Sequence, residues 1–192
     1  MSEKSHKKRI IVLLIIIFII ILGLAFGAYK LVTMSPEQSG SATTVADQNK
    51  ESTESLAAII SSTNDLNDFE KQLKNVGLFT DLEGNTPYTI FAFTNTGYKN
   101  SEQAVKDLFK QTDTELTKNI MNYHIASGKI DPDAMVDGLK IKTMNGSEII
   151  VKSEDKSLYI VDMKGDKRKV IEAGIPAKNG AIYEIDGVLL PQ

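Results

Sequence analysis

The sequence predicts an α+β domain that is preceded by one N-terminal transmembrane helix. Three observations support this fold class. Residues 10–29 form an uncharged and almost wholly aliphatic run. Apolar residues then recur at steps of three and four up to about residue 124, as on the buried face of a helix. After Gly138 the pattern changes to alternation and short apolar runs separated by turn dipeptides. Helices followed by antiparallel strands are typical of an α+β arrangement.

The N-terminal run is long enough to cross a membrane. At a rise of about 1.5 Å per residue, residues 10–29 can span a hydrocarbon core of about 30 Å. The basic residues Lys4, Lys7, Lys8 and Arg9 precede it. The positive-inside rule therefore predicts a cytoplasmic tail (1–9) and an extracytoplasmic remainder. The length favours a retained signal-anchor, whereas small residues at 25–27 leave a cleaved signal peptide and secretion as the alternative.

A flexible linker is expected between this segment and the domain. Residues 30–52 are rich in Ser, Thr, Gln, Asn and Glu and have no periodic apolar residues after Pro36. The domain then occupies 53–192. Five of the 22 basic and one of the 25 acidic residues lie up to Met34, which leaves a formal charge of −7 on the rest. An acidic domain without a basic face argues against nucleic acid as a partner.

Helix signals fill the first half of the domain. The run 56–60 is too short to assign, but a helix capped by Asn64 or Asp65 follows. Its apolar positions are Leu66, Phe69, Leu73 and Val76, and Gly77 provides the C-terminal stop. A second helix is expected from Ser101. A third begins at the capping box 112–115 and ends at His124.

Strand signals flank and follow these helices. The expected strands are 88–93, 139–144, 148–152, 157–162, 168–172, 181–185 and 188–190, the last stopped by Pro191. Asn145-Gly146 and residues 164–166 mark hairpin turns. Asn179-Gly180 and Asp186-Gly187 mark two further turns because glycine accepts a positive φ.

Three blocks in this order resemble the fasciclin domain. The first is the β-rich run 86–95, the second is the Tyr-His pair within 122–130, and the third is the C-terminal run 179–191. The likeness covers residues 52–192 and implies a compact β-sandwich or wedge flanked by helices. The family motif falls here on Thr94, Asn95, Tyr123, His124, Asn179, Gly180, Ile185 and Asp186. These residues have either a structural or a binding role, and surfaces near the Tyr-His pair are linked in the family to adhesion receptors.

Two positions depart from the family pattern. Phe93 stands where the first block usually has proline, and Tyr183 stands where the third usually has histidine. Tyr183 keeps an aromatic body and a polar tip, so packing can be preserved while a hydrogen bond that needs imidazole is lost.

Signals for catalysis and metal binding are weak. The chain has no cysteine and only two histidines, so any histidine base outside the cell would be His124. A helix-end histidine that packs inward is the favoured interpretation. Asp131, Asp133 and Asp137 lack the spacing of a calcium hand and are better explained as helix caps after Pro132. We therefore expect no enzyme activity, no cofactor and no metal.

A basic hairpin tip is the remaining charged feature, formed by Lys164, Lys167, Arg168 and Lys169. It can touch acidic glycans or phospholipid, and a solvated turn explains it equally well. Overall, we expect an extracellular binding or adhesion module, tethered to the membrane through its N-terminal helix, whose partner is a surface protein or glycan. The alternative is an envelope-associated structural or small-ligand-binding protein without adhesion, for which a closed apolar pocket is expected.

Overall fold

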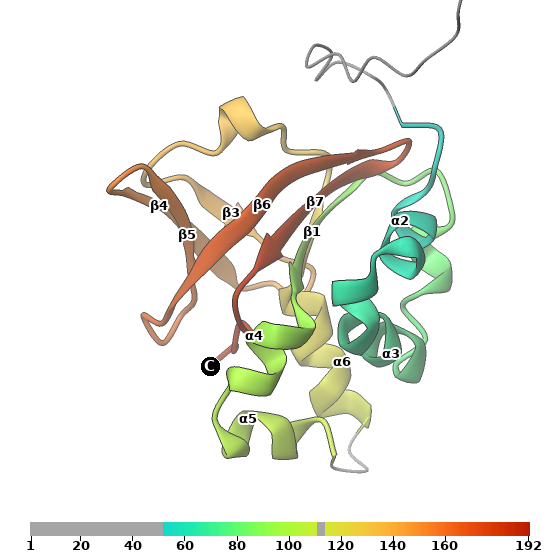
Figure 1. The fold of residues 1–192 in the computed structure, drawn as a ribbon, viewed down its shortest axis with the longest axis horizontal. Coiled ribbons are helices and arrows are strands. Elements are labelled where there is room, and N and C mark those ends of the chain that lie inside the picture. Colours follow the sequence, from blue (N-terminus) through green and yellow to red (C-terminus); the bar gives the residue numbers. More distant parts are fainter. Residues whose placement is uncertain (1–51, 111–113) are drawn as a thin grey trace, which may run out of the picture. The chain divides into compact units, whose positions relative to one another are not determined.

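The computed structural model describes residues 52–110 and 114–192. The expected tail (1–9), membrane segment (10–29) and all of the linker except Ser52 lie outside the described residues, as does Thr112 of the expected capping box. No helix within the described ranges is long and apolar enough to span a membrane. These ranges form an α+β fold, as the change of period predicts (Figure 1).

The helices precede most of the strands. The α-helices are α2 (Leu56–Ser62), α3 (Asn67–Asn75), α4 (Asn95–Asn100), α5 (Gln103–Leu108) and α6 (Thr114–Tyr123), and the 3-10 helices are η1 (Asn64–Leu66), η2 (Thr80–Leu82) and η3 (Pro132–Ala134). The strands are β1 (Tyr88–Phe93), β2 (Ile125–Ser127), β3 (Lys140–Lys142), β4 (Glu148–Glu154), β5 (Ser157–Val161), β6 (Lys167–Ala177) and β7 (Gly180–Ile185).

All seven strands belong to one mixed sheet, in the order β2-β1-β7-β6-β5-β4-β3. β1 and β7 pair in parallel, from Tyr88 opposite Gly180 to Phe93 opposite Ile185, so the expectation of antiparallel strands alone is wrong. β6 pairs with β5 through Lys167–Lys169 and with β7 through the rest, and its register with β7 shifts twice between Val170 and Ile175. The end strands approach each other, and a single bridge joins Ala126 to Thr143.

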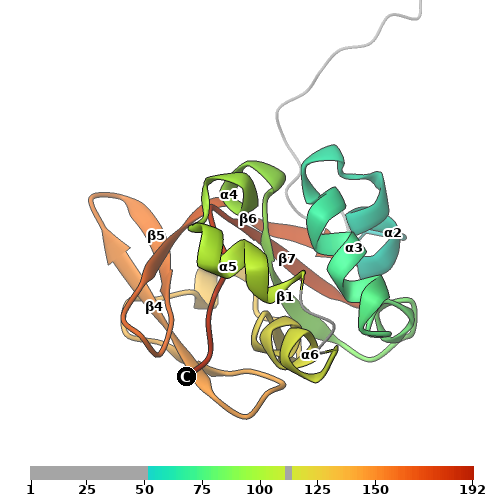
Figure 2. The ribbon, with the colours of Figure 1, turned by 90° about the horizontal axis from the view of Figure 1, so that it is seen from below.

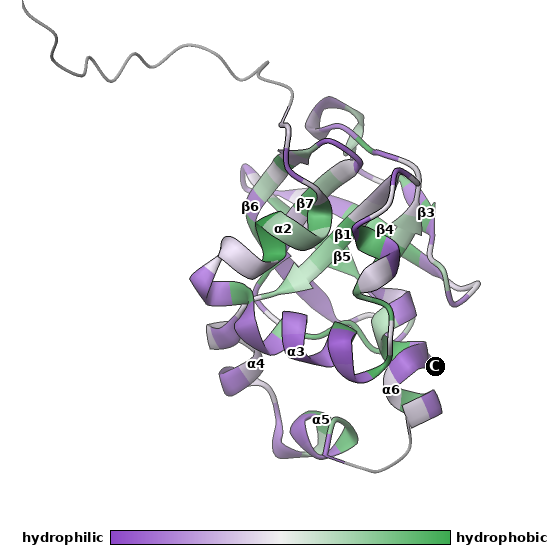
Figure 3. Ribbon diagram, turned by 90° about the vertical axis from the view of Figure 1, so that its right-hand side faces the viewer, coloured by the Kyte–Doolittle hydropathy of each residue, from purple (hydrophilic) through white to green (hydrophobic). Residues whose placement is uncertain are grey.

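The core lies where the helices meet the centre of the sheet. β7 is buried along its whole length. Figures 1 and 2 show the helices gathered at one side of the sheet, while the β4–β5 hairpin projects away from them. In Figure 3 the strands behind α3 and α6 are coloured hydrophobic and the outward sides of these helices hydrophilic.

Local signals explain several boundaries. Ser55 caps α2 by accepting a hydrogen bond from the amide of Ala58 (3.2 Å). Gly77 has a φ of +74°, and the amides of Gly77 and Leu78 return to the carbonyls of Lys74 and Leu73. This pair of hydrogen bonds is the Schellman ending of a helix, which confirms the predicted stop.

Other expectations need correction. Residues 188–190 do not form a strand, and Gly187 does not have a positive φ. The helix expected from Ser101 begins at Gln103, and the hydroxyl of Ser101 instead donates to the carbonyl of Gly97 (2.9 Å). Asp131 precedes η3 but makes no side-chain cap.

Candidate functional site

Thr94 and Asn95 fasten the end of β1 to neighbouring helices. The hydroxyl of Thr94 accepts a hydrogen bond from the amide of Gly97 (3.0 Å) and so caps α4. The side chain of Asn95 accepts from the amide of Asp68 (2.8 Å) and donates to the carbonyl of Asn64 (2.9 Å). Both residues therefore hold the helices that pack beside the sheet.

Asn179 ties together three distant segments. Its side-chain oxygen Oδ1 accepts a hydrogen bond from the amide of Leu56 (2.8 Å). Its side-chain NH₂ donates to the carbonyls of Leu82 (2.9 Å) and Gly84 (2.8 Å). Only 3% of the residue is exposed, so its position is set by these buried contacts.

Gly180 follows at a point where the chains approach closely. A Cβ atom on this residue would lie 2.0 Å from the carbonyl oxygen of Tyr88. Only glycine therefore fits at the start of the parallel β1–β7 pairing.

Ile185 and Asp186 close the other end of the same pairing. The carbonyl of Ile185 accepts from the amide of Thr94 (3.0 Å). The carboxylate of Asp186 accepts from the amide of Lys169 (2.8 Å), and its own amide donates to the carbonyl of Lys169 (3.0 Å). The first and third sequence blocks are thus adjacent in space although about 90 residues separate them.

His124 is fully buried with both ring nitrogens engaged. Nδ1 lies 2.8 Å from the carbonyl of Ile120, and Nε2 accepts from the amide of Leu189 (3.0 Å). Since a carbonyl can only accept, Nδ1 carries the proton and the ring is neutral. Burial lowers the pKa of His124 to about 4, although the hydrogen bond to Ile120 opposes this shift. The ring therefore has no free lone pair with which to act as a base.

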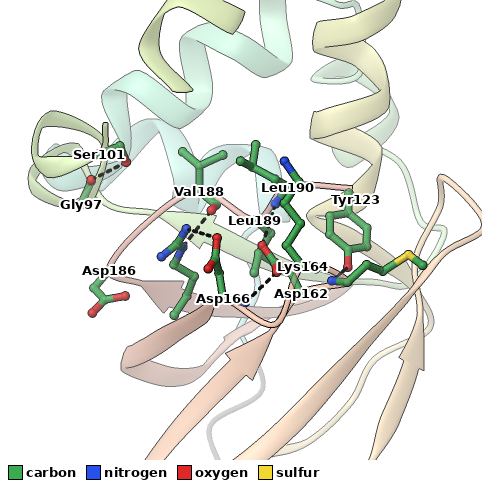
Figure 4. A network of polar contacts seen from close by, with 12 residues as sticks. Gly97, Ser101, Tyr123, Asp162, Lys164, Asp166, Asp186, Val188, Leu189 and Leu190 are labelled. Carbon is green, nitrogen blue, oxygen red and sulfur yellow. Dashed lines mark hydrogen bonds and ion pairs between the residues drawn. The ribbon is translucent and has the colours of Figure 1, made fainter. Parts of the chain in front are cut away.

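Tyr123 anchors α6 to the opposite part of the sheet. Its hydroxyl donates to the carbonyl of Glu148 (3.0 Å) and accepts from the amide of Met163 (3.0 Å). Burial raises the pKa of Tyr123 to about 12. Figure 4 shows its ring beside Asp162, whose carboxylate accepts from the amide of Leu190 (3.2 Å).

The two departures from the family pattern are accommodated in the core. The ring of Phe93 is fully buried. It packs edge-on against the ring of Phe69, with the ring centroids 5.0 Å apart, and stacks on the ring of Tyr98, with the centroids 5.6 Å apart. The ring of Tyr183 stacks on Phe91 at 5.7 Å. Its hydroxyl donates to the carbonyl of Ile130 (2.7 Å), so the tyrosine makes a hydrogen bond of its own.

Most of the motif residues are thus internal. Of the eight, only Asn95 and Asp186 have appreciable exposed surface. The other six contact backbone or side chains of the domain and are inaccessible to a macromolecular partner. Direct binding by the motif stays a prediction confined to these two residues.

Glu184 is a buried carboxylate that the sequence analysis missed. It is 8% exposed on β7, and burial together with the charges of Glu172 and Asp65 raises its pKa. Alternation along β7 would place it on a solvated face, but every residue of this strand is buried. No three acidic, histidine or cysteine side chains in the described ranges are arranged to hold a metal ion.

The other polar candidates have partners within the domain. Asp131 pairs with Lys129 (3.0 Å), and Asp137 accepts from the amide of Ser153 (2.9 Å). The basic tip is divided, because Arg168 donates from Nε to the carbonyl of Val188 (2.9 Å) and pairs with Asp166 (3.6 Å).

Two hollows open at the surface. One, of about 450 Å³, lies between α4 and the β5–β6 turn and includes Ser101, Arg168 and Asp186. The other, of about 720 Å³, lies between β3 and the segment 127–134 that follows β2. Its lining includes the apolar side chains of Ile130, Leu139 and Met144. Lys140 and Lys142 of β3 also line it.

The comparison with protein families agrees with this geometry. Residues 64–191 match the model of the Fasciclin domain, which covers more than half of the chain. The chain belongs to the fasciclin domain family. The likeness predicted from the three sequence blocks is thereby confirmed.

Bacterial proteins are among its relatives. The immunogenic protein MPT70 of Mycobacterium tuberculosis is 31% identical over 104 residues, 54% of this chain and 50% of its own length. The cell surface glycolipoprotein MPT83 of the same species is 30% identical over 117 residues, 61% of this chain and 49% of its own length. The chain therefore spans about half the length of these mycobacterial relatives. Protein sll1483 of Synechocystis is 25% identical over 172 residues, covering 89% of this chain and 92% of that protein.

A solved structure shares the fold. A FAS1 domain pair from the insect cell adhesion molecule Fasciclin I superposes with a TM-score of 0.63 at 19% identity, covering 72% of this chain and 51% of that one. At this level of identity the likeness establishes the fasciclin fold alone.

Proposed function

We propose that this chain is a membrane-tethered, extracytoplasmic binding module that contributes to adhesion at the cell surface. Its homology to cell-surface mycobacterial proteins supports the location. The N-terminal basic and apolar pattern supports the orientation and the tether. Weak contacts made by such a module gain strength when many tethered copies act together.

The observation that carries a binding role rather than catalysis is the state of His124. Its ring is buried, neutral and hydrogen-bonded through both nitrogens, so it lacks the access and the free lone pair of a general base. We infer that the domain acts by presenting a rigid surface.

The alternative is a small-ligand-binding envelope protein without an adhesive role. The hollow of about 720 Å³ between β3 and the segment 127–134 favours it, since ligand sites commonly have volumes of about 300–1,000 Å³. This hollow is open to solvent rather than the closed apolar pocket expected for that function.

The test compares cells that produce the full chain with cells that lack it. Protease added to intact cells should digest the domain, and producing cells should adhere more strongly to each other or to isolated envelopes. Protection of the domain would refute the orientation. Full digestion with unchanged adhesion would instead favour the small-ligand alternative.

A further inference from the structure

The solvent-facing side of β3 to β6 carries lysines around three half-buried apolar residues. We call it the lysine face, made of Lys140, Lys142, Ile150, Lys152, Tyr159, Val161, Lys167 and Lys169. In Figures 1 and 2 the β4–β5 hairpin at its centre stands apart from the helices.

Strand register assembles this face from residues far apart in the chain. Lys140 pairs with Ile150, which pairs with Val161, which pairs with Lys167. Residues directly opposite each other in an antiparallel sheet point to the same side. One row therefore reads Lys-Ile-Val-Lys across four strands.

The next row places an aromatic ring between two cations. Lys152 pairs with Tyr159, and Tyr159 pairs with Lys169. The intervening residues Val151 and Ile160 point the other way into the core and are fully buried. The same alternation turns Arg168 away from the lysine face, so the face shares Lys167 and Lys169 with the basic tip seen in the sequence but excludes Arg168.

The charges on this face are available to a partner. Lys140, Lys152 and Lys167 pair with Glu148 (3.6 Å), Asp137 (3.8 Å) and Glu154 (2.6 Å), and their side chains are 64%, 43% and 48% exposed. Exposed ion pairs of this kind are weak because solvent screens them, so another anion can replace the acidic partner. Among the described residues, Lys142 and Lys169 make no ion pair. Five lysines thus face three carboxylates in a domain that is otherwise acidic, so the expectation of a domain without a basic face is wrong.

We propose that the lysine face binds an acidic polysaccharide, which gives the proposed binding module its class of partner. Adjacent strands lie about 4.8 Å apart, so the backbones of Lys152 and Lys169 are roughly 10 Å apart and those of Lys140 and Lys167 roughly 14 Å. This spacing suits repeated anionic groups along an extended polymer. The flat strip of Ile150, Tyr159 and Val161 between the lysines suits the apolar face of sugar rings.

Other macromolecular partners fit this face less well. A stable protein interface buries about 800 Å² on each side around an apolar core, and three half-buried residues supply too little apolar surface. These residues also belong to the strands of the sheet rather than to a projecting amphipathic helix that could enter a lipid surface.

The test measures binding of the purified full chain, kept in solution by a non-ionic detergent, to immobilised alginate, a polyuronate. Retention should decrease as salt rises, because exposed charges are screened. The double variant Lys152→Gln/Lys169→Gln should bind about fivefold more weakly, since each exposed charge contact is worth less than a tenfold change. The control Lys71→Gln/Lys99→Gln removes the same charge from exposed positions on α3 and α4 and should leave binding unchanged.

Tyr159→Leu separates sugar recognition from simple charge attraction. It should weaken alginate binding about two- to threefold and leave binding to inorganic polyphosphate unchanged. Equal weakening by the face and control variants would overturn the proposal, as would binding only to phosphatidylglycerol vesicles or only to acidic protein. If cells that produce Lys152→Gln/Lys169→Gln still adhere as the wild type does, the lysine face is not the adhesive surface, but the proposed function stands. Alginate binding by a chain that does not promote adhesion would reject only the adhesive role.

Discussion

The two hydrogen bonds of His124 connect α6 to the C-terminal segment. Its ring packs edge-on against Phe69 and Phe93, with ring centroids 5.9 Å and 5.5 Å away. It also accepts a hydrogen bond from the amide of Leu189. The buried ring is neutral, with a pKa near 4 against an ordinary value of 6.5. As pH falls the unfolded chain binds the proton first, so the stability that the neutral ring provides is complete above about pH 6.5 and is lost progressively toward pH 4.

We therefore expect a pH-dependent loss of stability that requires His124. Between pH 7 and pH 5 the wild type should lose about 2 kcal/mol of unfolding free energy through this group. His124→Ala should be about 1–3 kcal/mol less stable at pH 7, because it loses packing and leaves the Leu189 amide unpaired. It should also lack this part of the pH dependence. Urea unfolding at both pH values measures both effects, and parallel pH profiles for the two proteins would contradict the assignment.

Asn179 should be among the most sensitive polar residues. Asn179→Ala leaves the Leu56 amide and two carbonyls without their partner, at a cost of about 2–3 kcal/mol. Asn179→Asp should cost at least as much, because it directs a carboxylate at the carbonyls of Leu82 and Gly84. Thermal unfolding compares these variants with Asn100→Ala on the exposed end of α4, which should change stability by less than about 0.5 kcal/mol. A small loss for Asn179→Asp would mean that the two donated bonds contribute little.

At the level of elements, the sheet depends on close contact between β1 and β7. Gly180→Ala would place a Cβ 2.0 Å from the Tyr88 carbonyl, so the strands must separate and stability should fall by more than about 3 kcal/mol. Gly146→Ala is the matched control, since its φ of +92° is strained but nothing lies within 4 Å. It should cost about 1 kcal/mol. Hydrogen exchange of the amides in Tyr88–Phe93 should quicken strongly only in Gly180→Ala, and equal protection in both variants would argue against a tight pairing.

Elements with local signals could be predicted from the sequence. Gly77 supplied the C′ position of α3, and Asn145-Gly146 marked the β3–β4 turn. The turn at Asp155 and Lys156 was missed, because both residues adopt a positive φ without glycine. The parallel pairing of β1 with β7 has no local signal, since the sequence of a strand does not specify whether its neighbour runs parallel or antiparallel to it. Residues 188–190 have the apolar pattern of a strand. The amides of Leu189 and Leu190 instead donate to the side chains of His124 and Asp162 rather than to a neighbouring strand.

The candidate site could be predicted less well than the fold. The motif residues were found in the sequence, but their burial is a property of the assembled core and not of the motif. Glu184 and Arg168 illustrate the difficulty, because tertiary packing buries a carboxylate on β7 and turns one member of a basic run away from the others. The lysine face depends on a four-strand register that no single segment encodes.

At the level of the whole molecule, the domain should begin before its family match. The match starts at residue 64, yet Leu56 and Ile60 of α2 are fully buried. We expect deletion of residues 1–52 to leave a cooperatively folded monomer. Deletion of residues 1–63 should abolish cooperative unfolding, because it exposes the apolar surface that α2 covers and leaves Asn179 without the Leu56 amide. Circular dichroism melts of the two proteins make the comparison, and equal stability would place the boundary at the family match.

The pairing of the first strand with the last also dictates when the domain can fold. β1 ends at residue 93, but its parallel neighbour spans residues 180–185, and the amides of Leu189 and Leu190 are needed by His124 and Asp162. A growing chain therefore cannot complete its core until residues 180–190 have left the ribosome. Contacts this distant in sequence also slow folding. On the extracytoplasmic location proposed above, this order keeps the chain open during its passage through the membrane and lets the domain close only after residues 180–190 have crossed.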